Sequence, residues 1–498
     1  MTKNEALKEI ASYQAANSAI DHAAGLIYYD AVTFAPEGSI EIRTKTLGEL
    51  TRMSYELDTD PKHAEALETL FSVKDELSLI DRKVVEELYR SYDRARKIPK
   101  QEMIDFQIHL SESEAVWHKA KATNDYKMFE PYLQKTFDTL KRFAGYTDPD
   151  KDPYDVALDT FERGLNQERC DKFFAALKKD LVPLIEQIGG AEQIDDSPLF
   201  RHYPKIQQQK FTEHIIDIMD IDRKYFTVGE TEHPFTTNFS KKDVRITTHY
   251  YEDALAYSLY SVVHEGGHAL YELHTADELF GTVLGTGVSM AIHESQSRFY
   301  ENIIGRSKEF CNLIFPFLKN EFKTQFADVD ADRFYRMINK SEPSLIRTEA
   351  DELTYPLHIM VRYELEKRMF SGDITAKDLP SEWNRLYKEY LGIDVPDDRR
   401  GVLQDSHWSG GQIGYFPSYA IGSAYGPQYL REMKKDIDVG SVIESGKLTE
   451  INNWLCDKIW KYGCIYDPSE LFEKVCGKFD PKCYTEYLKN KFSDIYGL

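Results

Sequence analysis

Two histidines four residues apart, with a glutamate directly after the first, constrain this 498-residue chain more than any other feature. The segment His264–His268 reads H-E-G-G-H. Residues four apart lie on one face of an α-helix, one turn above each other, so a helix lets both imidazoles share a metal ion. Glu265 then projects beside the pair and can reach a water that the metal activates. The spacing therefore predicts a helix that carries a hydrolytic metal centre.

The residues around this motif also favour a helix. Leu255, Leu259, Val262 and Val263 form an apolar stripe at helical spacing, and no proline interrupts Tyr251–Glu272. The two adjacent glycines of the motif each cost about 1 kcal/mol relative to alanine inside a helix. Two explanations for them are open: close packing against another helix, and room for a metal ion and a substrate.

A third metal ligand is expected downstream, because hydrolytic zinc sites combine two histidines with a carboxylate and an open position. Glu294 is the candidate, on a second predicted helix over Ser289–Asn302. His293 directly precedes it and is the alternative ligand. Glu294 and Arg298 are also spaced to form an ordinary surface ion pair. A carboxylate suits a peptidase better than a third imidazole, so we prefer Glu294.

Further motifs follow in a fixed order along the chain. They are H-P-F at His233–Phe235, D-V-R-I-T at Asp243–Thr247, H-E-S-Q at His293–Gln296, I-R-T-E-A-D at Ile346–Asp351 and G-V-L-Q-D-S-H-W at Gly401–Trp408. With H-E-G-G-H, this series resembles the M32 family of metallocarboxypeptidases, the thermostable carboxypeptidase 1 or carboxypeptidase Taq family. The resemblance runs from about residue 152 to the C-terminus, and more loosely to the N-terminus. One departure is Tyr29, where the family pattern has a tryptophan.

The resemblance implies roles that spacing alone does not assign. Arg347 would hold the C-terminal carboxylate of the substrate, a group that arginine binds through two hydrogen bonds. The spacing of Asp351, four residues later, suggests in addition that it orients Arg347. Tyr419 would lie near the scissile carbonyl and stabilise an oxyanion there, with Tyr415 and Tyr425 as neighbouring competitors.

The same resemblance places four more residues at the wall of a substrate groove. They are His233, Arg245, Gln404 and His407. There they would block one end of the groove and contact the substrate, and His407 would assist Tyr419 at the oxyanion. Structural hydrogen bonding is the alternative for the two histidines.

Apolar residues recur at helical spacing through most of the chain. The N-terminal region breaks at Pro36, Pro61 and Pro99, and Asp148–Tyr154 is rich in turn-forming residues. No repeat, low-complexity segment or long linker is present. We therefore expect one continuous unit over residues 1–498, rather than separate domains.

Within that unit we expect an N-terminal helical part to about residue 150 and a metal-bearing part over about 151–498. The segment Tyr225–Thr248 differs from the rest, with short β-branched and aromatic runs, and predicts a small antiparallel sheet beside the metal helix. A long helix should begin at Arg347 and another at about Tyr419. The predicted class is all-α, and the resemblance implies two lobes around a deep cleft with the sheet lining the groove.

Composition bears on partners and compartment. The net charge is −22, which argues against nucleic acid and against anionic membrane surfaces as partners. No apolar stretch of about 20 residues suggests a membrane span. The N-terminal residues lack the apolar region of a signal peptide, and the six cysteines contain no C-x-x-C pair. We expect reduced cysteines and a cytoplasmic protein.

The sequence thus predicts a metallocarboxypeptidase of broad specificity that hydrolyses the C-terminal bond of peptides with free C-termini. His264, His268 and Glu294 would bind one divalent ion, Zn²⁺ before Co²⁺, and Glu265 would be the general base. The alternative is a metal-dependent oligoendopeptidase on a related helical fold. The resemblance also implies a homodimer.

Overall fold

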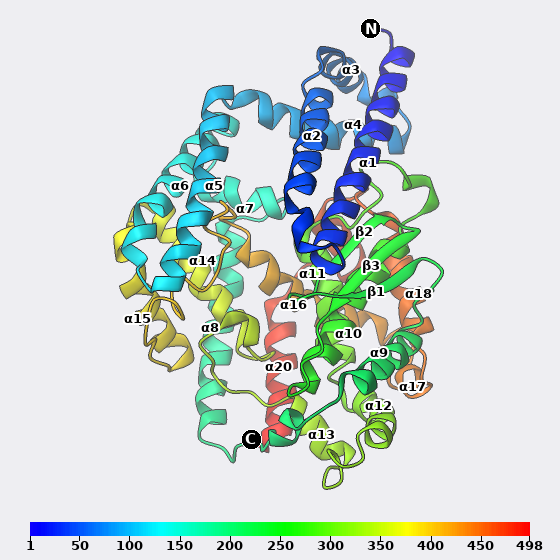
Figure 1. Cartoon of the computed structure of the whole chain (residues 1–498), viewed down its shortest axis with the longest axis vertical. Helices are drawn as coiled ribbons and strands as arrows, with labels where there is room; N and C mark the ends of the chain where they lie inside the picture. Colours follow the sequence, from blue (N-terminus) through cyan, green and yellow to red (C-terminus); the bar gives the residue numbers. More distant parts are fainter.

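The computed structural model describes all 498 residues and contains twenty α-helices and one three-stranded sheet (Figure 1). The helices before the sheet are α1 (Lys3–Thr33), α2 (Ile40–Asp58), α3 (Pro61–Ser72), α4 (Leu79–Lys97), α5 (Lys100–Thr123), α6 (Tyr126–Thr147), α7 (Pro153–Phe161), α8 (Gln167–Gly189) and α9 (Lys205–Met219). Those after it are α10 (Leu255–Leu273), α11 (Met290–Arg298), α12 (Lys308–Glu321), α13 (Ala331–Ile338), α14 (Tyr355–Ser371), α15 (Leu379–Leu391), α16 (Phe416–Met433), α17 (Val439–Glu444), α18 (Thr449–Lys458), α19 (Pro468–Cys476) and α20 (Pro481–Tyr496). The predicted helical class is confirmed.

The prolines end and begin helices as their chemistry requires. Pro36 lies between α1 and α2, Pro61 is the first residue of α3, and Pro99 directly precedes α5. Proline is tolerated at a helix start because the first backbone N–H groups have no helical partner. The predicted turn at Asp148–Tyr154 separates α6 from α7.

The sheet lies beside the metal helix as predicted, but one of its two pairings differs from the prediction. Its strands are β1 (Phe226–Glu230), β2 (Thr236–Ser240) and β3 (Asp243–Thr248), in the spatial order β1-β3-β2. β2 and β3 form an antiparallel hairpin, whereas β1 pairs with β3 in parallel. The chain crosses the end of β3 between β1 and β2, so β1 and β3 run in the same direction. The prediction of an all-antiparallel sheet was therefore wrong.

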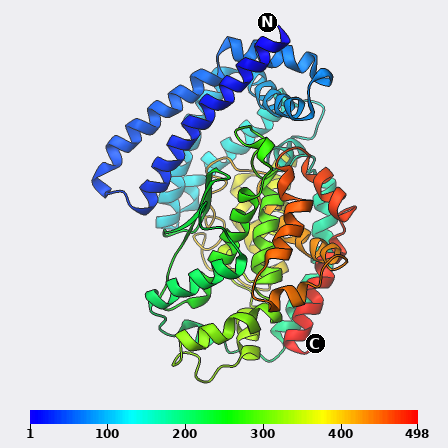
Figure 2. The same cartoon turned by 90° about the vertical axis from the view of Figure 1, so that its right-hand side faces the viewer.

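Two apolar clusters hold the chain together. The larger contains 100 buried residues and extends from Trp117 in α5 to Ile495 in α20, so it spans the expected boundary near residue 150. The smaller joins α1, α3 and α4 to Leu279 and Leu284, which follow the metal helix. Figure 2 shows α1 and α2 as a long hairpin that projects from the rest of the molecule. None of the helices combines the length and apolar character of a membrane span, and all six cysteines are unpaired.

The two glycines of the metal helix α10 allow close packing. A Cβ at Gly267 would lie 2.8 Å from the carbonyl oxygen of Gln296 in α11. A Cβ at Gly266 would lie 2.7 Å from Cε of Met219 at the end of α9. The contact at Gly267 is with backbone, so a larger residue there would push α10 and α11 apart, whereas the flexible end of Met219 could move away from a side chain at Gly266. The packing explanation is therefore the one that the structure supports.

The prediction that a long helix begins at Arg347 is wrong for the first turns of that helix. Arg347 lies in a short 3₁₀ turn, Arg347–Glu349, and α14 begins only at Tyr355. Asp351 separates the two elements, because its carboxylate accepts hydrogen bonds from backbone N–H groups ahead of α14 and from the Thr354 hydroxyl. Asp351 therefore organises the start of this helix and does not hydrogen-bond to Arg347.

Candidate active site

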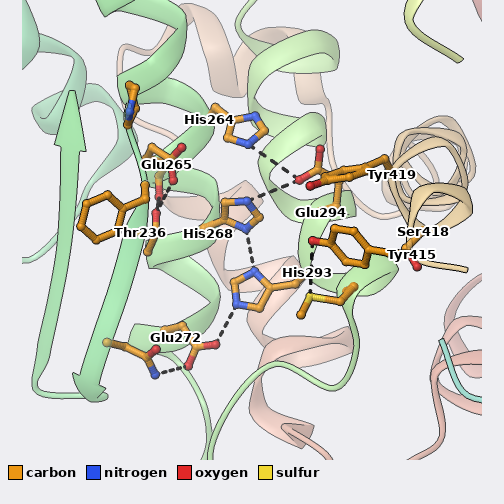
Figure 3. A pocket seen from close by; sticks show the side chains of 14 residues that line it. Thr236, His264, Glu265, His268, Glu272, His293, Glu294, Tyr415, Ser418 and Tyr419 are labelled. Atoms are coloured by element: carbon orange, nitrogen blue, oxygen red, sulfur yellow. Dashed lines mark hydrogen bonds and ion pairs between the residues drawn. The ribbon is translucent and has the colours of Figure 1, made fainter. Parts of the chain in front are cut away.

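Three side chains from two adjacent helices converge on one point (Figure 3). His264 and His268 lie one turn apart on α10, and Glu294 projects toward them from α11. Glu294 Oε2 is 3.7 Å from His264 Nε2 and 3.5 Å from His268 Nε2. One ligand atom from each residue lies within 4.8 Å of the others. Two imidazole nitrogens and one carboxylate oxygen are the donors of hydrolytic metal sites, so the set fits a divalent ion.

The other ring nitrogens support this fit. His264 Nδ1 is 2.8 Å from Glu301 Oε2, and His268 Nδ1 is 2.6 Å from His293 Nδ1. Hydrogen bonds at Nδ1 leave both Nε2 atoms facing Glu294. Burial lowers the pKa of His268 to about 4, so its ring is neutral at neutral pH, as a ligand must be.

Glu294 makes the predicted ion pair as well as facing the histidines. Arg298 Nε donates to Glu294 Oε1 over 2.8 Å, which leaves Oε2 directed at the histidines. Burial alone would raise the pKa of Glu294, but Arg298 and the two histidines hold it well below its ordinary value. The carboxylate is therefore ionised. The ion pair that the spacing suggested does form, but it is buried and not on the surface.

Glu265 lies beside the three converging side chains and is held by the sheet. It is 8% exposed, and the Thr236 hydroxyl in β2 lies 2.6 Å from its Oε2. Burial raises the pKa of this carboxyl group above its ordinary value. The hairpin thus positions the general-base candidate, a role for Thr236 that the sequence did not reveal.

Two cavities meet at this point. The first, of about 380 Å³, extends toward Met290 and Tyr415, and the second, of about 680 Å³, extends toward Arg347 and Tyr355. The residues that line both are Pro234, His264, Glu265, Glu294 and Tyr419. A peptide that passes from one cavity to the other would cross the converging side chains.

Arg347 lies in the wall of the second cavity and is held from behind. Its Nε donates to Asp405 Oδ1 over 2.9 Å, and Arg362 Nε donates to Asp405 Oδ2 over 2.7 Å. Gln404 Oε1 accepts from the Arg347 backbone N–H and from Arg362 Nη2. The guanidinium groups of Arg347 and Arg362 share the one carboxylate of Asp405, so these three side chains together keep one net positive charge. Asp405, and not Asp351, orients Arg347.

Tyr419 is the tyrosine that lines both cavities, whereas Tyr415 lines only the first and Tyr425 lines neither. α16 begins at Phe416, three residues before the start that the sequence predicted near Tyr419. His407 lines neither cavity; its Nε2 lies behind Tyr419, 3.4 Å from the hydroxyl. Burial and the positive charge of Arg347 lower the pKa of His407 to about 4. A neutral His407 can orient Tyr419, but it does not face the cavities itself.

The other three residues that were expected at the groove wall line neither cavity. His233 is exposed and lines neither cavity. Arg245 pairs with Asp243 at 2.8 Å and stacks on Tyr29 of α1, so it joins the sheet to the N-terminal helices. Gln404 lies behind Arg347, as described above. The sequence motifs mark these residues without showing that two of them hold neighbouring elements together.

Four residues that contact the candidate site residues were not identified from the sequence. Three of them lie at positions that the sequence pattern could have indicated. Glu272 follows His268 by four residues and Glu301 follows Glu294 by seven, so both lie on the metal-facing side of their helical segments. Asp405 lies within the motif Gly401–Trp408, which does not reveal its contact with Arg347. Arg362 is fully buried and had no signal, because only the fold brings it to Asp405.

The comparisons with known proteins agree with this geometry. The family described as carboxypeptidase Taq (M32) metallopeptidase matches residues 9–492. Carboxypeptidase 1 of Bacillus subtilis (strain 168) is 38% identical over 495 residues, which cover 99% of this chain and 97% of that protein. Thermostable carboxypeptidase 1 of Thermus thermophilus is 35% identical over 515 residues, covering 100% of both chains.

A solved structure gives the same result for the fold. The crystal structure of an M32 carboxypeptidase from Deinococcus radiodurans R1 matches with a TM-score of 0.96 at 32% identity, over 99% of this chain and 100% of that one. The resemblance found in the motifs is therefore confirmed over nearly the whole length. Membership of this family implies a divalent metal ion, for which the three converging side chains are the candidate site. The chain belongs to the carboxypeptidase Taq (M32) family of metallopeptidases.

Proposed function

We propose that this metallopeptidase removes single residues from the free C-termini of peptides, with broad specificity. His264, His268 and Glu294 hold one divalent ion, Zn²⁺ before Co²⁺, because imidazole and carboxylate donors suit zinc. The observation that carries the proposal is the second cavity, whose lining includes two of these residues, His264 and Glu294, together with Arg347. A carboxylate fixed at Arg347 would leave the last peptide bond near the ligands.

The charge around Arg347 supports binding of a carboxylate. One net positive charge remains after Asp405 is shared, and Arg347 Nη2 has no hydrogen-bond partner in the structure. Arg347 is 6% exposed, so a substrate carboxylate would meet it in a partly dry cavity. Charge-assisted, bidentate pairing is strongest there. An oligoendopeptidase has no need of such a group, which disfavours that alternative.

The residues then divide the chemistry between them. When bound, the metal polarises the scissile carbonyl and lowers the pKa of a water. Glu265 accepts the proton of the attacking water and transfers it to the leaving amine. The hydroxyl of Tyr419 donates a hydrogen bond to the carbonyl oxygen as negative charge develops, with His407 behind it. Arg347 fixes the register of the substrate.

Four further expectations remain proposals. The broad specificity is supported by the mixed apolar and polar lining of the second cavity. A homodimer is supported by exposed apolar side chains on the α1–α2 hairpin, such as Phe34 (77% exposed) and Ile42 (71%). The common apolar core supports one unit over residues 1–498, and unpaired cysteines support a cytoplasmic location.

The central test compares a peptide acid with its C-terminal amide. Arg347→Ala should lower kcat/KM for the acid by roughly 10- to 150-fold, because a charge-assisted contact is worth about 1.5–3 kcal/mol. Amidation should cost the wild-type enzyme a similar factor but cost Arg347→Ala much less, since the contact is already lost. Arg347→Lys should rescue only in part, because an ammonium lacks the planar fork.

The products of the same reactions show which bonds are cut. Mass spectrometry of the wild-type digest should show a ladder that shortens one residue at a time from the C-terminus. If the peptide acid and its amide were cleaved equally well, or if internal bonds were cleaved, the proposed carboxypeptidase activity would be refuted and an oligoendopeptidase activity supported.

A second prediction concerns Tyr419. Tyr419→Phe should lower kcat by about 10²-fold, because one donor to the developing oxyanion is lost while the ring remains. The matched control is Tyr425→Phe on the same helix, which lines neither cavity and should leave kcat unchanged. Steady-state kinetics on one free-acid peptide measures both. Equal kcat in the two variants would remove Tyr419 from the mechanism.

A further inference from the structure

His293 lies at the centre of the site, yet the mechanism gives it no role. Both of its ring nitrogens are engaged: Nδ1 is 2.6 Å from His268 Nδ1, and Nε2 is 2.7 Å from Glu272 Oε1 (Figure 3). A histidine with both nitrogens in hydrogen bonds has no lone pair left for a metal. His293 therefore forms a chain that runs from the ligand His268 to the carboxylate of Glu272.

The surroundings of Glu272 fix where the protons of this chain lie. Glu272 is 2% exposed and accepts hydrogen bonds from Asn238 Nδ2 at 2.7 Å, the Thr286 hydroxyl at 2.8 Å and the Gly287 backbone N–H at 3.0 Å. A carboxylate surrounded by donors acts as an acceptor, so His293 must donate to it from Nε2.

The remaining protons follow from this one. A neutral His293 with its proton on Nε2 has a bare Nδ1, which can only accept. His268 must then carry its proton on Nδ1, which leaves its Nε2 lone pair free on the side of Glu294. A proton on His293 Nδ1 would reverse this arrangement and place a proton on the His268 nitrogen that faces Glu294.

The position of the His293 ring is also fixed by packing. A Cβ at Gly287 would lie 2.5 Å from Cδ2 of His293 and 2.9 Å from the ring of Tyr271. The polypeptide backbone therefore packs directly against the ring at Gly287, which has no side chain. Gly287 also donates its backbone N–H to Glu272. Geometry and hydrogen bonding thus restrict His293 to one orientation.

We propose that Glu272 and His293 are positioning residues that set the proton of His268 and so prepare its Nε2 to bind the metal. His264 obtains the same preparation directly from Glu301, whereas His268 obtains it through an intervening histidine. This inference rests on the proposed metal site. Loss of such outer partners typically weakens metal binding about 10- to 100-fold.

The test measures metal affinity in full-length variants by competition with a chelator, using Zn²⁺ and Co²⁺. His293→Leu removes the acceptor for His268 and should weaken binding about 10- to 100-fold. His293→Asn can still accept from His268 through Oδ1 and should lose less. The matched control is His274→Leu, another half-buried histidine with a hydrogen bond, at the end of α10, which should bind as the wild type does.

A double variant tests whether Glu272 acts through His293. Glu272→Leu alone should weaken binding by a similar factor, but combined with His293→Leu it should add little, because the chain is already broken. A residue with a separate structural effect would add its own factor. Thermal unfolding of each metal-free variant identifies any that do not fold, and His293→Asn then carries the comparison.

Proton NMR of the Co²⁺-loaded wild type gives a readout that needs no destabilising variant. Two shifted signals that disappear in D₂O are expected, one from each ligand Nδ1–H, and His293→Asn should retain both. The proposal is overturned if folded His293→Leu binds metal within about threefold of the wild type. It is also overturned if His293→Asn loses metal as completely as His264→Ala, because His293 would then be a ligand. A wild-type protein that binds no metal would refute the metal site itself.

Discussion

Glu265→Gln should lower kcat by about 10²–10⁴-fold while the protein keeps its fold and its metal. Glutamine has the size of glutamate and can still accept the hydrogen bond from Thr236, but it cannot take the proton of the attacking water at neutral pH. Glu265 is not among the three converging ligands, so metal binding should be unaffected. The measurement is kcat on a free-acid peptide together with the metal content of the same sample.

The control for this variant is an exposed glutamate far from the chemistry. Glu278→Gln makes the same chemical change in a surface turn and should leave kcat unchanged. If Glu265→Gln retained more than about one tenth of the wild-type kcat with full metal, another group would have to be the base.

The convergence of the three candidate metal ligands could be predicted because its information is local. Helical periodicity places His264 and His268 on one face, and a second helix supplies Glu294 from a short distance along the chain. The sequence left two explanations open for the two glycines, and the structure supports close packing, which the sequence could not assign to a partner helix. In the structure, Gly422 of α16 allows an equally close approach, since its Cβ would lie 2.8 Å from the carbonyl oxygen of Ala291.

The part that failed depends on contacts between distant segments. Arg347 and Asp405 are 58 residues apart, so no local pattern could show that Asp405 rather than Asp351 holds the guanidinium. The parallel pairing of β1 with β3 likewise depends on how the chain crosses the end of the sheet. Motif membership marks His233 and Arg245 without saying where their side chains lie.

The contacts among His268, His293 and Glu272 also could not be predicted from the sequence. The sequence raised His293 as an alternative ligand because it precedes Glu294. Adjacent residues on a helix point about 100° apart, so only one of the pair could face the metal. In the structure Glu294 faces His264 and His268, whereas the carboxylate of Glu272 holds the second nitrogen of His293.

Alanine in place of His264, His268 or Glu294 should remove the bound metal and nearly all turnover. Three protein donors surround the site, and two remaining donors hold a divalent ion much more weakly. The polarisation that the metal supplies is worth several kcal/mol, so turnover should fall by roughly 10³-fold or more. Metal stoichiometry of the purified protein, measured beside kcat, tests the three variants together.

Glu294→Ala is the sharpest of the three, because it separates the carboxylate from its neighbour on the helix. It should also leave Arg298 without its 2.8 Å partner on Oε1, so some loss of thermal stability is expected and is measured separately by unfolding. A Glu294→Ala protein that kept one metal per chain and full activity would show that the third ligand is elsewhere. His293 would then have to leave its hydrogen bonds to His268 and Glu272, so this outcome would refute the inferred positioning chain as well.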